Sequence, residues 1–228
     1  MKLSVIIPVY NEEKTIGEII RRVGMVDLEK EIIVVDDGSE DGTRLFLENM
    51  RKDGSEHVKI IFHEKNSGKG AAIRTGLGHV RGDAVIIQDA DLEYDPEDYV
   101  KLLEPIKNGQ SKIVYGSRNL GNNPKGMFLY RWGGIFLSFL ANVLYGIRIT
   151  DEATCYKVFS TDVLKSFGLR CRKFEFCPEV TAKAAKKKYK IIEVPISYAP
   201  RNKKEGKKIS VRDGIMAIWI LIKYRFTD

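Results

Sequence analysis

Apolar and polar positions alternate in blocks along the first ~120 residues. Short runs rich in Val and Ile end in polar or turn residues, which predicts β-strands. These runs cover residues 2–10, 31–42, 58–65, 83–94 and 112–118. The intervening segments place apolar residues at helical spacing, and in segment 11–24 Asn11 is the expected N-cap. Strands that alternate with helices predict an α/β fold, a mostly parallel sheet flanked by helices.

The second half of the chain is less regular. We expect an apolar helix over residues 132–149, a Lys-rich helix, a strand over 191–198 and an amphipathic C-terminal helix over 211–226. Segment 132–149 approaches the ~20 residues that cross a bilayer. However, it contains Gly, Ser, Asn and Arg148, so we expect it to be buried or to face a membrane without spanning it. With no linker or repeat visible, the sequence predicts a single domain, 1–228, whose functional halves are about 1–120 and 121–228.

Composition narrows the class of protein. The apolar content of 43% predicts a packed core, and three cysteines without a CxxC pair argue against a disulfide framework or a structural zinc site. The N-terminus lacks the features of a signal peptide, so a cytoplasmic protein is expected. The net charge of +7 comes largely from residues 183–190 and 201–208. Such basic clusters form a solvent-exposed surface or contact phosphates or an anionic membrane. No nucleic-acid module is visible, so no nucleic acid partner is expected.

Carboxylates follow the predicted strands. Asp36 and Asp37 end one strand, and Asp89 and Asp91 end another. Ligands bind beyond the carboxyl ends of parallel strands, so these side chains should meet in one crevice. Residues i and i+2 of a strand share a face, which would aim Asp89 and Asp91 at one Mg²⁺ or Mn²⁺ ion.

Other acids and other folds fit less well. Three further acidic side chains are predicted to belong to the first turn of a helix that starts at Pro96; they are Asp95, Glu97 and Asp98. A phosphorylated receiver domain would leave half of the chain unexplained. A dinucleotide-binding GxGxxG and a P-loop GxxxxGK[ST] are absent, and the loop SGKGAA resembles a phosphate loop only superficially.

Several motifs, in this order, resemble those of family 2 glycosyltransferases of the GT-A fold. They are SVIIPVYNEE, VVDDGSEDGT, NSGKGAAIRTG, DADLEYDPED and YGSR. TDEATCYKVFS and EVPISYAPRNKKEGKKIS resemble the later motifs of the polyprenyl-phosphate branch, typified by dolichol-phosphate mannose synthases. The resemblance implies a hexosyltransferase that uses Mg²⁺ or Mn²⁺. It would move mannose or glucose, with inversion, from a GDP- or UDP-sugar to a polyprenyl or dolichyl phosphate. The alternative acceptor is a hydroxyl group of a glycan or polysaccharide.

The resemblance also implies roles for individual residues. Nucleotide-sugar contacts would come from Pro8, Tyr10, Asn11, Glu12, Asp37, Lys69, Asp89, Arg201 and Lys207. The metal would be bound by Asp91, by Asp89 and by Glu93, where the family often has another ligand. Arg118 and Arg131 would bind the acceptor phosphate, and a basic loop of Arg201, Lys207 and Lys208 would close over the diphosphate. The family pattern has a Lys after the Ser at position 210, and this chain does not.

The acceptor decides whether a base is needed. A lipid phosphate is already ionised, whereas a hydroxyl acceptor needs a carboxylate to take its proton, and Asp151 is the candidate for that role or for orienting the acceptor. Together with Asp91 and Arg118, Asp151 completes the predicted catalytic set. A lipid acceptor implies a cytoplasmic protein at the periphery of the inner membrane face. A regulatory module with a degraded site and a nucleotidyltransferase remain as alternatives, although the latter usually has a GxGTR-like loop that is absent here.

Overall fold

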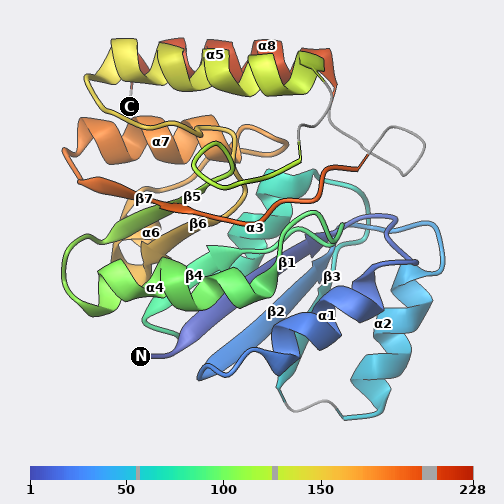
Figure 1. Ribbon diagram of the computed structural model, residues 1–228. Coiled ribbons are helices and arrows are strands. Elements are labelled where there is room, and N and C mark those ends of the chain that lie inside the picture. Colours follow the sequence, from blue (N-terminus) through green and yellow to red (C-terminus); the bar gives the residue numbers. More distant parts are fainter. Residues whose placement is uncertain (55–56, 125–127, 202–209, 228) are drawn as a thin grey trace.

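The computed structural model describes residues 1–54, 57–124, 128–201 and 210–227 (Figure 1). Within them, one sheet has the strand order β3-β2-β1-β4-β6-β5-β7. The strands are β1 (Leu3–Val9), β2 (Lys30–Asp36), β3 (Val58–Phe62), β4 (Ala84–Ile87), β5 (Ile113–Ser117), β6 (Lys157–Ser160) and β7 (Ile191–Pro195). All pairings are parallel except those of β6, which runs antiparallel to both β4 and β5. The predicted α/β class with a mostly parallel sheet is confirmed.

Helices cover both faces of this sheet. They are α1 (Ile16–Met25), α2 (Thr43–Lys52), α3 (Lys69–Leu77), α4 (Tyr99–Lys107), α5 (Phe128–Tyr145), α6 (Thr161–Ser166), α7 (Phe176–Lys186) and α8 (Val211–Phe226). A 3₁₀ turn, η1 (Pro96–Asp98), precedes α4. Because both faces are covered, every residue of β1 and β4 is buried, which explains why their sequences read as unbroken apolar runs.

Two expected helix boundaries were wrong. Asn11 is not an N-cap: Thr15 occupies that position, while Asn11 has a φ of 50° and its Oδ1 accepts a hydrogen bond from the Glu40 N–H. The apolar helix runs over Phe128–Tyr145 and not over 132–149, because Gly146 takes a φ of 66°, a left-handed conformation that ends helices.

Strand β4 is shorter than its apolar and acidic sequence predicted. It ends at Ile87. The Gln88 N–H still donates to the Ile6 carbonyl of β1 at 2.9 Å, and the Gln88 amide oxygen accepts hydrogen bonds from the hydroxyls of Tyr99 (2.5 Å) and Tyr156 (2.6 Å). Asp89 and Asp91 therefore lie on the turn after the strand, so the strand-periodicity argument for their shared direction does not apply.

A helical layer lies over one end of the sheet. Helices α5 and α8 run side by side, and α7 separates them from the strands (Figure 1). The Tyr145 hydroxyl donates to the Leu221 carbonyl at 2.6 Å, and the Tyr224 hydroxyl donates to Glu179 at 3.0 Å. Large apolar side chains nevertheless remain exposed on the pair; they include Trp132, Phe136, Phe139, Val143, Ile215, Trp219 and Phe226. Of the helices in the described ranges, none combines the length and hydropathy that crossing a membrane requires.

Candidate functional site

A cavity of about 580 Å³ lies at the carboxyl ends of the central strands. It gathers residues that the sequence singled out from widely separated segments: Pro8, Tyr10, Glu12, Asp37, Lys69, Asp89, Asp91, Glu93, Arg118 and Arg201. Asn11 does not line it. Lys207 and Lys208 lie outside the described residues. The crevice expected from a parallel sheet is thus formed at the predicted edge.

The Asp37 carboxylate fixes one wall of this cavity. It accepts hydrogen bonds from the N–H groups of Ser67 (3.0 Å) and Gly68 (2.7 Å), and it lies 2.7 Å from Nδ1 of His63. Gly68 has a φ of 97°, and a Cβ there would come within 2.4 Å of the Arg172 carbonyl oxygen. Only glycine fits at position 68, so Asp37 holds a turn whose geometry the sequence specifies closely.

Two N–H groups at the start of α3 are already bonded within the protein. The Gly70 N–H donates to the Lys173 carbonyl and the Ala71 N–H donates to the Arg172 carbonyl, both at 2.9 Å. The protein thereby satisfies groups that a phosphate loop would offer to its ligand. The resemblance of SGKGAA to such a loop is therefore superficial, as the sequence indicated.

Charged pairs line the floor of the cavity. The Lys69 ammonium forms an ion pair with Asp89 and lies 3.6 Å from the sulfur of Cys155. Burial is the largest single influence and would lower the pKa of Lys69, but the charge of Asp89, the cysteines Cys155 and Cys177 and the hydrogen bond to Asp89 together hold that pKa well above its usual range. Lys69 stays protonated and is available to an anionic ligand.

Asp91 lies among like charges. Burial, followed by the charges of Asp89 and Glu93, raises the pKa of Asp91 to about 7, against the opposing effect of Arg201. The cluster is therefore short of positive charge, and its hard oxygen atoms suit Mg²⁺ or Mn²⁺. Yet across the described part of the chain, no three His, Cys, Asp or Glu side chains converge to form a closed metal site. Asp91 fits as one protein ligand to a metal whose other ligands come from the substrate.

Glu93 binds the segment that leads to Arg201. Its carboxylate accepts hydrogen bonds from the Tyr198 hydroxyl and from the Arg201 N–H, both at 2.8 Å, and its carbonyl accepts one from the Ala199 N–H. These contacts fasten segment 198–201 to the turn after β4, and Tyr198 and Arg201 of this segment line the cavity. Both Glu93 oxygens thus bind this segment, and the role of Glu93 as a metal ligand stays a prediction.

Asp98 has a similar role. Its Oδ2 accepts a hydrogen bond from the Ser197 N–H at 2.6 Å, and only 6% of the residue is exposed. It is therefore more than a first-turn charge. Asp95 does cap the turn as expected, accepting a hydrogen bond from the Glu97 N–H at 3.1 Å, and Pro96 stands at the start of the turn.

A second cavity, of about 750 Å³, adjoins the first. Segment 118–124, helix α5 and helix α8 form its walls, and Arg118, Arg131 and Asp151 line it. The two cavities share Arg118 and Tyr198, together with Leu137, Ala153 and Gly214. A group bound in one cavity can therefore meet a group bound in the other beside the Arg118 guanidinium.

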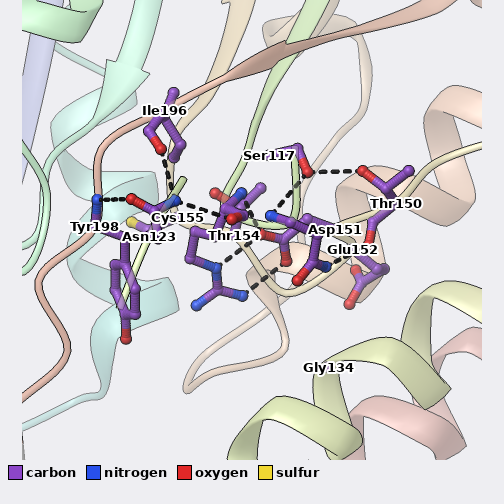
Figure 2. Close-up of polar contacts among 12 residues, drawn as sticks. Ser117, Asn123, Gly134, Thr150, Asp151, Glu152, Thr154, Cys155, Ile196 and Tyr198 are labelled. Carbon is purple, nitrogen blue, oxygen red and sulfur yellow. Dashed lines mark hydrogen bonds and ion pairs between the residues drawn. The ribbon is translucent and has the colours of Figure 1, made fainter. Parts of the chain in front are cut away.

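Asp151 holds Arg118 in this junction. Arg118 donates to Asp151 from its backbone N–H (2.9 Å), from Nε (2.7 Å) and from Nη2 (2.7 Å), and its guanidinium stacks on the Tyr198 ring at 5.1 Å. Figure 2 shows Asp151 at the centre of the network, with Ser117 and Thr150 on one side and Asn123 and Tyr198 on the other. Both Asp151 oxygens are bound by the arginine, so this carboxylate is oriented toward Arg118 and not toward a proton of a ligand.

Sequence reasoning missed two residues of the site. Tyr198 lines both cavities and contacts Glu93 and Arg118, and its place in the motif EVPISY was a signal that could have identified it. Glu193, the first residue of the same motif, accepts hydrogen bonds from the N–H groups of Thr150 (2.7 Å) and Asp151 (3.0 Å).

Comparisons with known proteins identify relatives of this chain. Residues 4–168 match the model of "Glycosyl transferase family 2". A UDP-N-acetylglucosamine–dolichyl-phosphate N-acetylglucosaminyltransferase from Methanococcus voltae is 34% identical, over 85% of this chain and 84% of the relative. A dolichol-phosphate mannosyltransferase from Pyrococcus furiosus is 35% identical over 91% of this chain, which spans only 59% of that relative.

Solved structures show the same fold. Glucosyl-3-phosphoglycerate synthase from Mycobacterium tuberculosis, in complex with Mn²⁺, UDP and phosphoglyceric acid, superposes with a TM-score of 0.72 at 19% identity, over 100% of this chain and 79% of that one. TarS from S. aureus in complex with UDP-GlcNAc gives 0.66 at 20% identity, over 98% of this chain and 66% of that one. The arrangement is the GT-A fold.

Proposed function

Since the chain belongs to glycosyl transferase family 2, we propose that it transfers a sugar from a nucleotide diphosphate to the phosphate group of a polyprenyl lipid. Two relatives named for dolichyl-phosphate glycosylation, each more than 30% identical over most of this chain, support the lipid phosphate as acceptor. Other matched relatives are named as undecaprenyl- and dodecaprenyl-phosphate enzymes.

The observation that carries this proposal is the position of Arg118 where the two cavities meet. We assign the cavity that holds Asp91 and Lys69 to the donor and the cavity between α5 and α8 to the acceptor. A phosphate in the second cavity would find the Arg118 guanidinium directly beside the donor cavity, and Arg131 of α5 lines the same second cavity. A planar guanidinium is well suited to orienting a phosphate oxygen for attack.

The Asp151 geometry supports an acceptor that is already ionised. A hydroxyl acceptor would need a carboxylate with an oxygen available for its proton. Both Asp151 oxygens bind Arg118, and only 1% of its side chain is exposed. In this proposal Asp151 is a positioning residue for Arg118, and the phosphate attacks without a general base.

The donor cavity supplies cations for the leaving diphosphate. A bound Mg²⁺ or Mn²⁺, held by Asp91 and by substrate oxygens, would polarise the diphosphate. Lys69, whose pKa is held high, would stabilise the negative charge that develops as the sugar leaves. Pro8, Tyr10 and Asp37 line the wall that we assign to the nucleoside.

The exposed apolar side chains of α5 and α8 support a place at the membrane surface. They lie on the helices that wall the acceptor cavity, and α8 ends with Lys223 and Arg225 in its last turn. Apolar and basic side chains together favour an anionic interface. We therefore propose peripheral attachment at the cytoplasmic face, where a lipid phosphate would enter between the two helices.

The sugar and the nucleotide are a matter for experiment. We keep the sequence-based prediction of mannose or glucose from a GDP- or UDP-sugar. The relatives are named for N-acetylglucosamine, mannose, 4-deoxy-4-formamido-L-arabinose and galacturonate, so related chains differ in donor. GDP-mannose, UDP-glucose and UDP-N-acetylglucosamine are therefore the donors to compare first.

The test is transfer of radiolabel from each donor to a polyprenyl phosphate in detergent with Mn²⁺. We expect label in the organic extract with polyprenyl phosphate and none with the matched polyprenyl alcohol, because the alcohol lacks the ionised oxygen. Arg118→Gln should abolish this product while leaving donor binding measurable. Transfer to the alcohol, or to a water-soluble glycan in place of the lipid, would overturn the proposal.

A further inference from the structure

Arg201 bridges carboxylates from two different segments of the donor cavity. Its Nη1 and Nη2 lie 3.2 and 3.3 Å from the two oxygens of Glu12, and Nη2 also lies 3.1 Å from Oδ2 of Asp91. Glu12 follows β1 and Asp91 follows β4, so one guanidinium neutralises acids that the fold brings together.

The position of Arg201 is fixed by its backbone. The Arg201 N–H donates to Glu93, and the preceding segment is fastened through Tyr198 to Glu93 and through Ser197 to Asp98. These hydrogen bonds hold the backbone that places the guanidinium beside Asp91.

The guanidinium is not fully satisfied in this position. Its Nε is buried and has no hydrogen-bond partner in the described structure, although both terminal nitrogens contact carboxylates. An unpaired donor on a buried cation is costly. It leaves Arg201 with a hydrogen bond to offer an incoming acceptor such as a diphosphate oxygen.

We propose that Arg201 is the resident counter-cation of Asp91, competes with a divalent ion for that carboxylate, and transfers to the diphosphate when the metal-bound donor enters. The second part rests on the proposed function, because it requires a nucleotide diphosphate in this cavity. The first part concerns only the free protein and a cation.

Substitution of Arg201 should change two affinities in opposite directions: the affinity for Mn²⁺ alone and the affinity for a nucleoside diphosphate with Mn²⁺. Removing Arg201 frees Asp91 and Glu12 for a cation, so Mn²⁺ alone should bind more tightly. The same substitution removes a donor to the diphosphate, so a nucleoside diphosphate with Mn²⁺ should bind more weakly. A residue with a merely structural role would weaken both.

The measurement is Mn²⁺ binding to the free protein, followed by the electron paramagnetic resonance signal of unbound Mn²⁺. We expect Arg201→Ala to bind Mn²⁺ about fivefold more tightly than wild type, because the ion must no longer compete with one partly screened ion pair. In the presence of UDP or GDP with Mn²⁺, we expect the nucleotide to bind at least tenfold more weakly. Lys173→Ala is the matched control, because Lys173 lines the same cavity but has no contact with Asp91 among those of the described residues.

Guanidinium chloride at a non-denaturing concentration separates a specific contact from a general loss of charge. In Arg201→Ala it should return Mn²⁺ affinity toward the wild-type value, more than sodium chloride does at the same ionic strength, and it should have no such effect on wild type. This comparison is made within one variant, whose folding is checked by circular dichroism.

The outcomes are decisive for the free protein. Mn²⁺ affinity in Arg201→Ala equal to or below wild type, an equal gain in Lys173→Ala, or absence of the guanidinium effect would each overturn the proposal. Failure of lipid glycosylation would overturn the proposed function and leave the Mn²⁺ result standing, because that measurement uses neither sugar nor acceptor.

Discussion

The pair of Asp151 and Arg118 allows a quantitative prediction. Asp151→Asn keeps the size of the side chain but removes the charge that receives three hydrogen bonds from Arg118. The Asp151 side chain is 1% exposed and that of Arg118 is 23% exposed, so water compensates for the loss only at the arginine. Breaking a fully buried pair costs about 3–5 kcal/mol. The partial exposure of Arg118 lowers this to about 3 kcal/mol.

Thermal and urea unfolding measure this loss. For a chain of this size, ~3 kcal/mol corresponds to a decrease in Tm of about 6–12 °C. The matched control is Asp162→Asn, since Asp162 and its partner Lys112 are 67% and 58% exposed; it should leave Tm unchanged. If Asp151→Asn unfolded at the same temperature as Asp162→Asn, the pair would not be the buried anchor that we describe, and the reasoning that excludes Asp151 as a base would fail with it.

Two further predictions test the metal cluster and the packing of the sheet. The pKa of Asp91 is raised from 3.8 to about 7, so the folded protein holds the proton of the Asp91 carboxyl more tightly than the unfolded chain does. The free energy of unfolding of the metal-free wild type should therefore decrease as pH rises from about 4 to 7. Asp91→Asn should reduce that decrease in urea titrations. An equal pH dependence in the variant would contradict the assignment. A Cβ on Gly76 would lie 2.6 Å from Ile6, whereas one on Gly24 would meet nothing within 4 Å. Gly76→Ala should therefore destabilise the fold by about 1–3 kcal/mol, and Gly24→Ala should stabilise it by up to ~1 kcal/mol in the same unfolding assay; a gain for both would refute the close approach of α3 and β1.

Local sequence was sufficient for much of the donor side of the fold. Strands β1 to β3 and helix α1 follow from runs of β-branched residues and from helical spacing, because each is dictated by burial of its own residues. The convergence of Asp37 and Asp91 followed from the rule that parallel strands end at one edge. These features depend on periodicity, which a single sequence displays directly.

Contacts between distant segments could not be read in this way. Strand β6 is only four residues long and includes the buried Lys157, so its sequence gave no sign that it inserts between β4 and β5. The Lys157 ammonium is compensated by the carbonyls of Glu152 and Thr154, which only the folded loop brings to it. The hydrogen bond from the Arg201 N–H to Glu93 spans 108 positions, and the motif around Glu93 contains no sign of it.

The insertion of β6 has a consequence for synthesis of the chain on the ribosome. The sheet β3-β2-β1-β4 can assemble once residue 87 has emerged, whereas among the described residues β5 pairs with β6 and β7 alone. For the ~40 residues that separate β5 from β6, the nascent chain must carry a strand that is fully buried in the folded protein without a partner, and an open edge on β4. Such edges invite pairing with other chains. We therefore expect a fragment that stops near residue 120 to aggregate, and the delay between β5 and β6 to be the interval in which a translating chain most needs a chaperone.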